Sequence, residues 1–133
     1  MDTERTEHTE STEKTLSEIV IGAALEVHRT LGPGLLESTY EECLTHELAL
    51  RGLQIERQCF VALDYKSIHI HNAFRLDFWV ERKLIIELKA VEQFLPLHEA
   101  QLLTYLRLTG CKTGLLINFN SKLLKNGIRR LSL

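Results

Sequence analysis

The sequence predicts a single α/β domain in which one mixed sheet is flanked by helices, with the elements in the order ααββββαβ. The chain has 133 residues, of which 44% are hydrophobic, so it is long enough for one buried core and short for two. Apolar residues recur at helical spacing up to about residue 51, and short β-rich runs follow. A third helical stretch then precedes a last apolar strand. No repeat or boundary divides residues 15–133, so we expect one domain there.

The first two helices are predicted from an apolar stripe and from the residues that stop helices. Residues 1–14 alternate Thr, Glu and Ser and lack apolar side chains after the first residue, so we expect a flexible acidic tail. Residues 15–18, Thr-Leu-Ser-Glu, fit a capping box for the first helix, which ends at Gly-Pro-Gly 32–34. The second helix runs from about residue 35 to 51, and Gly52 terminates it.

The middle of the chain is predicted to form strands because it is rich in β-branched and aromatic residues. Four such runs follow one another through short connections, which is typical of an antiparallel meander. Pro96 is a good first-turn residue for a helix over 96–109, and Gly110 stops it. The largely apolar residues 114–119 are typical of a buried strand, and a basic tail follows. The runs of the meander are residues 54–65, 68–70, 74–80 and 84–89.

Charge is distributed unevenly along the chain, although the net charge is only −2. Residues 1–15 carry five acidic and two basic side chains, whereas the chain from Ala100 onward carries six basic and no acidic ones. A polyanion can dock on such a segment. A solvated basic surface is the alternative interpretation, because lysine and arginine are common on surfaces. The predicted nucleic-acid contacts are Lys122, Lys125, Arg129 and Arg130.

The cysteines and the apolar runs indicate the redox state and the cellular location to expect. Cys43, Cys59 and Cys111 are odd in number and far apart, so neither a disulfide framework nor a cysteine zinc site is indicated. We interpret them as reduced structural thiols. The first residues have no apolar core of a secretory signal, and no apolar run approaches the ~20 residues of a membrane-spanning helix. A cytoplasmic location is therefore expected.

The segment that carries chemistry is a hairpin with Asp77 before its turn and Glu87 and Lys89 after it. In a hairpin centred on Arg82, Asp77 and Glu87 are equally far from the turn, so their carboxylates would lie opposite each other. Mg²⁺ prefers one or two carboxylates together with waters and phosphate oxygens. Lys89, on the same strand face as Glu87, could orient or help deprotonate the attacking water. The alternative is an exposed cross-strand ion pair, although the strand around Glu87 is too apolar for an open edge.

These residues resemble the motif of the PD-(D/E)XK nuclease superfamily, in which an aspartate precedes an apolar strand that carries E-x-K. The next helix carries Gln101 and Tyr105, which look like the Q-x-x-x-Y motif of the RecB-like branch. The resemblance implies a restriction-endonuclease-like fold in which Gln101 and Tyr105 hold the catalytic lysine or a nucleotide phosphate. The alternative for that pair is a polar helix stripe with a half-buried tyrosine. Leu76 stands where the superfamily's name has proline.

A closer resemblance is to the GxxExxY family, whose signature residues 34–40 spell as Gly-Leu-Leu-Glu-Ser-Thr-Tyr. The similarity extends over residues 16–119 and implies a divalent-metal nuclease core of unspecified substrate. RecB-like relatives often add a carboxylate from an early helix to the metal shell, and Glu37 is the matching position. Its alternative role is to favour the helix macrodipole, and Glu41 is expected to be a solvated helix acid. The resemblance thus implies the metal ligands Asp77, Glu87 and Glu37, and the catalytic residues Asp77, Glu87, Lys89, Gln101 and Tyr105.

Other candidate sites have simpler interpretations. His28 could point toward the same site, but a lone helix histidine is usually structural. His69 and His71 share one face of a short strand, and two ligands without a third make a weak zinc site, so we place them on the surface. Gly-Pro-Gly 32–34 follows a helix and lacks the phosphate-loop pattern, so we expect a helix connector.

We therefore predict a nuclease that hydrolyses phosphodiester bonds of nucleic acid, with DNA expected, using Mg²⁺ or Mn²⁺. The rival prediction is a catalytically inactive nucleic-acid-binding or protein-interaction module with a nuclease-like fold. A third possibility is a site completed only in a homodimer or by a helicase-like partner. The sequence does not specify the strand structure of the substrate or the choice between endo- and exonucleolytic cleavage.

Overall fold

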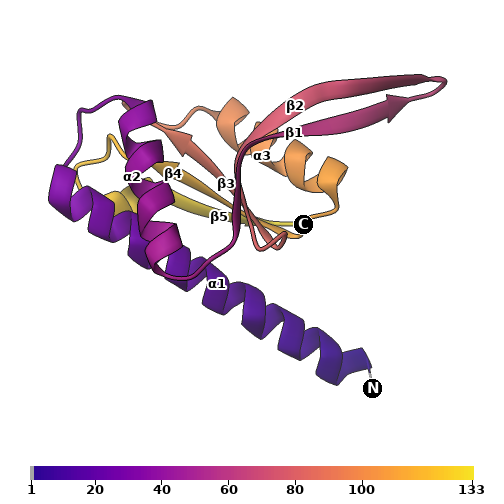
Figure 1. Ribbon diagram of the computed structural model, residues 1–133, viewed down its shortest axis with the longest axis horizontal. Helices are drawn as coiled ribbons and strands as arrows, with labels where there is room; N and C mark the ends of the chain where they lie inside the picture. The colour runs from indigo at the N-terminus through magenta and orange to yellow at the C-terminus, as the bar shows by residue number, and fades with distance from the viewer. Residues whose placement is uncertain (1) are drawn as a thin grey trace.

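The computed structural model describes the backbone of residues 2–133 and the side chains of residues 15–133. Figure 1 shows helices packed on a five-stranded sheet, so the predicted mixed sheet flanked by helices is confirmed. The helices are α1 (Asp2–Leu31), α2 (Glu37–Leu50) and α3 (Pro96–Thr109), with a 3₁₀ turn η1 (Leu124–Gly127). The strands are β1 (Ile55–Tyr65), β2 (Ile68–Val80), β3 (Leu84–Lys89), β4 (Thr113–Asn118) and β5 (Ile128–Ser132).

The strands lie in the order β1-β2-β3-β4-β5, and only β3 and β4 are parallel among the four neighbouring pairs. Parallel strands need a crossover connection, and α3 provides it between β3 and β4. As a result the carboxyl ends of both strands meet at one edge of the sheet. Lys89 and Asn118 are register partners at this edge.

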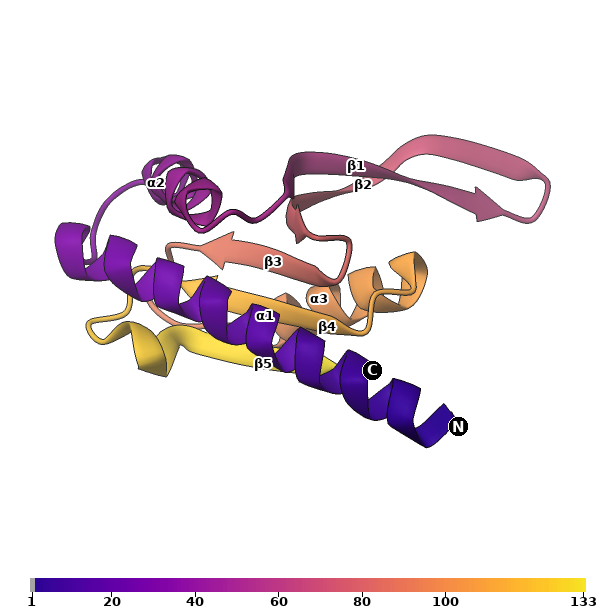
Figure 2. The same cartoon turned by 60° about the horizontal axis from the view of Figure 1, so that its bottom comes forward.

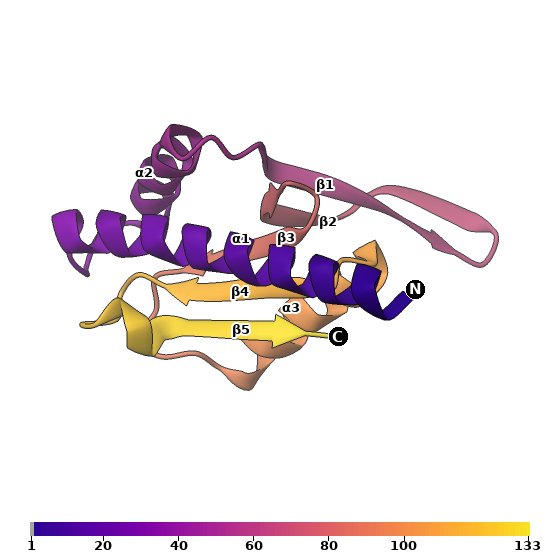
Figure 3. The same cartoon turned by 90° about the horizontal axis from the view of Figure 1, so that it is seen from below.

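Two apolar cores lie on the two faces of the sheet. α1 and α2 cover one face and α3 covers the other, as Figures 2 and 3 show. The larger core includes the fully buried rings of Tyr40, Phe78 and Phe119. The smaller core gathers around Leu76 and Leu102 beneath α3. Because β3 is covered on both faces, it is apolar throughout except at Glu87 and Lys89.

The strand content differs from the prediction in two places. Residues 68–70 and 74–80, predicted as separate strands, form the single strand β2. A bulge absorbs the residues between them, because the register with β1 shifts by two residues after Val61. The predicted basic tail instead forms η1 and β5, in which Ile128 and Leu131 pack against the two cores. Basic side chains suit an edge strand because they discourage pairing with another sheet.

Helix α1 is longer than predicted. Its backbone begins at Asp2 rather than at the capping box over residues 15–18. No glycine or proline interrupts residues 2–14, and their glutamate, arginine and lysine residues are good helix formers. The N-terminal turns extend away from the sheet in Figure 1. The side chains of residues 1–14 lie outside the described residues, and the flexibility expected for this segment stays a prediction.

The β1–β2 hairpin bends sharply where β2 leaves β3, and its distal half projects away from the sheet (Figures 1 and 2). Leu76 belongs to the α3-side core and Phe78 to the α1-side core, although residues two apart in a regular strand share a face. Asp77 lies between Leu76 and Phe78. Gln58 stands across the hairpin from Asp77 and has a left-handed φ of 52°. A left-handed residue redirects the strand, so this bend exchanges the two faces of the hairpin.

Candidate active site

Asp77 lies at the point where the β2–β3 ladder ends. The register between the two strands runs only from Phe78↔Ile86 to Val80↔Leu84. Asp77 would be paired with Glu87 if the ladder continued, as the hairpin centred on Arg82 predicts. The bend at Gln58 instead takes β2 away from β3 here. This local separation leaves room for carboxyl groups between the strands.

Asp77 and Glu87 fill this gap with two hydrogen bonds from main chain to side chain. The Asp77 N–H donates to Glu87 Oε1 at 3.0 Å, and the Leu88 N–H donates to Asp77 Oδ2 at 2.8 Å. Each bond satisfies a backbone donor that the interrupted ladder would otherwise leave without a strand partner. The predicted opposition of the two carboxylates is therefore present, and each is oriented by the other's strand.

The electrostatics of the pair are dominated by burial and like charge. The Glu87 residue is only 5% exposed. Burial and the neighbouring Asp77 carboxyl raise the pKa of Glu87 to about 9, although the Asp77 N–H and Lys89 act in the opposite direction. Without a cation, therefore, one of the two carboxyl groups holds a proton at neutral pH.

Glu37 reaches the same site from the N-terminus of α2. Partial desolvation of its carboxyl group and the Asp77 charge raise the pKa of Glu37, while Lys89 lowers it. Lys89 thus acts electrostatically on the carboxyl groups of both Glu37 and Glu87. Asp77 thus interacts electrostatically with both Glu37 and Glu87.

Tyr40 holds the connector that precedes Glu37. Its hydroxyl donates to the Gly32 carbonyl at 2.5 Å and accepts the Leu35 N–H at 3.1 Å. Its ring stacks on Phe119, with the centroids 4.7 Å apart. The glycine and tyrosine of residues 34–40 therefore shape the chain on either side of Glu37, and Gly34 adopts a φ of 99° that favours glycine. The connector prediction for residues 32–34 agrees with this turn.

Glu41, expected to be a solvated helix acid, is instead half-buried and anchors the hairpin bend. Its carboxylate accepts a 2.9 Å hydrogen bond from Arg57 Nε and another from the side-chain amide of Gln58. The Gln58 Oε1 atom is buried and has no hydrogen-bond partner among the described residues. The prediction for Glu41 was wrong because Arg57 and Gln58 reach it from another element, a contact that helix periodicity cannot reveal.

The two predicted site residues on α3, Gln101 and Tyr105, differ in burial. Tyr105 is half-buried and stacks on Phe74 with the ring centroids 4.8 Å apart. Burial raises the pKa of Tyr105, and the charges of Glu87 and Asp77 raise it further, so the phenol lies within electrostatic reach of the pair. Gln101 is exposed and forms no side-chain hydrogen bond within residues 15–133. Its contact with the lysine or a phosphate stays a prediction.

A comparison with family models identifies the superfamily of the chain. A family model described as the PD-(D/E)XK nuclease superfamily matches residues 14–131, nearly the whole chain. The chain belongs to the PD-(D/E)XK nuclease superfamily. Searches of curated proteins and of solved structures return no match.

PD-(D/E)XK nucleases generally use divalent metal ions, which the side chains of the site would have to bind. Among the side chains of residues 15–133, no three or more His, Cys, Asp or Glu form a metal-binding group. Mg²⁺ needs only one or two carboxylates when waters and substrate phosphates complete its shell. One oxygen of Asp77 and one of Glu87 accept backbone N–H groups, and the two carboxyl groups also interact with each other through their side chains. The pair therefore fits a hard divalent cation.

The remaining PD-(D/E)XK motif residue, Lys89, is fixed through its main chain. Its carbonyl accepts the Phe119 N–H at 2.9 Å. The side-chain amide of Asn118, its register partner, donates to the Val91 carbonyl at 2.8 Å and accepts the Val91 N–H at 3.0 Å. Asn118 thus ties down the chain just after Lys89. Sequence reasoning missed this residue, although a lone polar residue in an apolar strand was a signal.

The predicted basic contacts do not form one surface. Arg129 and Arg130 point to opposite faces of β5: Arg129 lies over the Phe94 ring at 5.5 Å, and Arg130 Nε donates to Ser17 at 3.3 Å. Lys122 and Lys125 line a separate depression below α1. The physical reason is strand alternation, which separates neighbouring side chains once the supposed tail becomes a strand. Nucleic-acid contact by these four residues stays a prediction.

The histidines that the sequence singled out have partners within the fold. His28 Nε2 lies 2.7 Å from the Ser121 carbonyl, which gives it a structural partner. His69 pairs with Asp64 at 2.5 Å on the exposed hairpin, and its ring meets His71 edge-on. The three cysteines are free.

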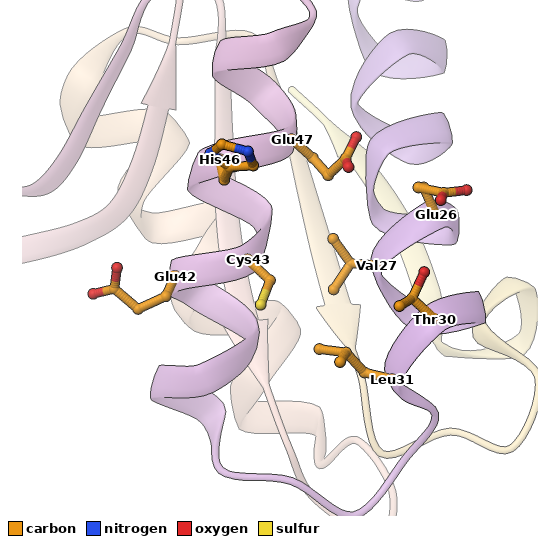
Figure 4. Close-up of a pocket in the computed structure, with 8 residues that line it drawn as sticks. All are labelled: Glu26, Val27, Thr30, Leu31, Glu42, Cys43, His46 and Glu47. Atoms are coloured by element: carbon orange, nitrogen blue, oxygen red, sulfur yellow. The ribbon is translucent and has the colours of Figure 1, made fainter.

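A cavity of about 320 Å³ lies between α1 and α2 (Figure 4). Val27, Leu31 and Cys43 supply apolar lining, and glutamates stand at its rim. None of the predicted site residues lines this cavity. Among the described residues, no helix is long and apolar enough to cross a membrane.

Proposed function

We propose that this protein is a divalent-metal-dependent nuclease that hydrolyses phosphodiester bonds of nucleic acid, with DNA as the expected substrate. The observation that carries the proposal is the mutual orientation of Asp77 and Glu87 across the split between β2 and β3. Both carboxyl groups are oriented by backbone N–H groups, and one of them is buried. A cation that replaces the proton they share would lower the electrostatic free energy of the pair.

Asp77 and Glu87 would hold Mg²⁺ or Mn²⁺, and Glu37 would complete the protein's share of the ligands. A bound divalent ion supplies positive charge that offsets the charge developing on the phosphate oxygens. Lys89 would orient the attacking water and help to remove its proton, since it projects from the same strand face as Glu87. Tyr105 and Gln101 would contact the lysine or a phosphate from α3.

The finer family assignment belongs to this proposal. Residues 34–40 carry the GxxExxY signature, and the contacts of Tyr40 give that signature a physical role in presenting Glu37. Gln101 and Tyr105 lie one turn apart on α3, as the Q-x-x-x-Y motif of the RecB-like branch requires. We therefore propose that the protein belongs to the GxxExxY family, within that branch.

The test is cleavage of labelled single-stranded, duplex and branched DNA and of RNA, with Mg²⁺, Mn²⁺ or EDTA. Lys89→Ala is expected to lower the metal-dependent rate by about a hundredfold or more, the usual loss for a residue that moves a proton. Lys83→Ala is the matched control, because Lys83 is exposed in the β2–β3 turn of the same hairpin. Cleavage that survives Lys89→Ala would point to a contaminating nuclease and contradict the proposal.

The second candidate is a nucleic-acid-binding module that does not cleave. The protonated state of the Asp77–Glu87 pair favours it, because a carboxyl group with a pKa of about 9 is a poor metal ligand at neutral pH. Salt-dependent binding without cleavage in any of the reactions above would support this candidate. A homodimer or a helicase-like partner could complete either protein, and sedimentation at two concentrations tests the homodimer.

A further inference from the structure

The projecting half of the β1–β2 hairpin concentrates the exposed aromatic side chains of the protein. Among residues 15–133, only Phe60 and Tyr65 are exposed aromatic residues of the Phe, Tyr or Trp type, at 55% and 58%. Both lie on this hairpin arm, residues 59–76. A basic side chain lies over each ring: the Arg75 guanidinium is 5.9 Å from the Phe60 ring centroid, and the Lys66 ammonium is 5.4 Å from the Tyr65 ring centroid. Exposed rings cost solvation free energy unless a partner covers them.

Arg75 differs from the other two arginines of the hairpin, which form ion pairs. Arg57 and Arg82 on the same hairpin pair with glutamates, as do Arg29 and Arg51 on the helices. Arg75 forms no ion pair with any described carboxylate. Its guanidinium lies over the Phe60 ring. An exposed, unpaired guanidinium is available to bind an anion.

The Phe60–Arg75 pair lies next to the candidate active site. Phe60 and Arg75 are register partners, so they share one face of the ribbon. The next pair toward the bend, Cys59 and Leu76, packs on the core beneath α3, so Phe60 and Arg75 point away from α3. Arg75 is two residues from Asp77, and its charge acts on Tyr105. A polymer held by Asp77 therefore has this pair as its first neighbour along the arm.

We propose that Phe60 and Arg75 bind an unpaired nucleotide beside the cleavage position, so that the substrate class is nucleic acid with a single-stranded segment. This inference rests on the proposed function. A base stacks on the free face of the Phe60 ring, and the Arg75 guanidinium pairs with the adjacent phosphate. Bases inside a duplex already stack on one another and present no free face. Tyr65 and Lys66 form a similar ring–cation pair at the tip of the arm, but Tyr65 lies on the opposite face from Phe60 and is not part of this site.

The test measures binding without metal, so that it does not depend on catalysis. Fluorescence anisotropy with a labelled 20-nucleotide single strand and with the matching duplex is recorded in EDTA. Phe60→Leu keeps an apolar side chain but removes the flat ring, and it is expected to weaken single-strand binding by about tenfold, within the range measured for one stacked base. Phe60→Trp restores stacking and is expected to restore the affinity. Duplex binding should change less than about twofold.

Arg75→Gln tests the phosphate contact, and Ile70→Ala is the matched control. Arg75→Gln is expected to reduce the salt dependence of single-strand binding by about one phosphate contact. Ile70 is 39% exposed on the opposite face of the arm, so Ile70→Ala should leave nucleic-acid affinity unchanged. Circular dichroism confirms that each variant is folded.

Three results would overturn the proposal. One is wild-type affinity of Phe60→Leu for the single strand, and another is equal weakening for single strand and duplex. The third is a dimer that Ile70→Ala dissociates while Phe60→Leu leaves single-strand binding intact, which would assign the arm to contact between copies. If Lys89→Ala fails to affect cleavage while the ring dependence holds, the catalytic proposal fails and the arm remains a single-strand site.

Discussion

The carboxyl groups of Asp77 and Glu87 each accept a hydrogen bond from a backbone N–H in the strand of the other. The Asp77 N–H bonds to Glu87 Oε1 at 3.0 Å, and the N–H of Leu88, next to Glu87, bonds to Asp77 Oδ2 at 2.8 Å. The carboxylates thus replace the ladder hydrogen bonds where β2 and β3 part. Stability and cation binding are therefore coupled at one point, because the same oxygens sit in a buried, negatively charged gap.

The first prediction concerns stability against pH in the absence of metal. The pKa of Glu87 rises from 4.5 when unfolded to about 9 when folded, so the protonated form favours folding. This contribution is fully present below about pH 4.5 and is lost as the pH rises through about 9, with a slope of at most about 1.4 kcal/mol per pH unit. Glu87→Gln should flatten this fall. Urea denaturation in EDTA from pH 5 to 9 measures it, and the same slope in Glu87→Gln would refute it.

The second prediction concerns the hairpin bend at Gln58. A β-branched residue strongly disfavours a φ of 52°, so Gln58→Val should distort the bend and break the hydrogen bond from the Leu88 N–H to Asp77. Amide hydrogen exchange at Leu88 should then speed up by about tenfold or more. Gln58→Gly, which adopts this φ easily, should keep the protection. Lys66→Val is the control, because Lys66 has a φ of 53° at the hairpin tip. Equal effects of both valine variants on Leu88 would contradict the prediction.

The third prediction concerns the turn that presents Glu37. Tyr40→Phe keeps the stacking on Phe119 but leaves the Gly32 carbonyl and the Leu35 N–H without their partner. The free energy of unfolding should fall by about 1–3 kcal/mol, the usual cost of unsatisfied polar groups. Tyr65→Phe, on the exposed arm, should change it by less than about 0.5 kcal/mol. Chemical denaturation compares the two variants, and indistinguishable results would remove this role for Tyr40.

Much of the sheet and the central pair of carboxylates could be predicted because both depend on local patterns. The apolar strand around Glu87 and the turn near Arg82 sufficed to place Asp77 opposite Glu87. The bend could not be predicted, because glutamine is not a residue that signals a left-handed conformation. The role of Glu41 depends on Arg57, which is 16 residues away in sequence and arrives only through the tertiary fold.

The C-terminal strand shows the same limit. Arg129 and Arg130 suggested a continuous basic surface, and the wide spacing of Ile128 and Leu131 hid the alternation of a strand. The edge position of β5 explains why charged residues are tolerated there. The sequence also could not show that Arg75 lacks an ion pair, because the ion pairs of the other hairpin arginines depend on tertiary contacts with glutamates.

The central claim is that Asp77 and Glu87 form a divalent-cation site, and calorimetric titration of Mn²⁺ into the intact protein tests it most directly. Binding at one site is expected, and its affinity should rise by up to about tenfold per pH unit from pH 6 to 8, because Glu87 must release a proton. Asp77→Asn should abolish the binding, and Asp64→Asn, on the exposed arm, should leave it unchanged. Wild-type Mn²⁺ affinity in Asp77→Asn, or no binding to the native protein, would contradict the claim.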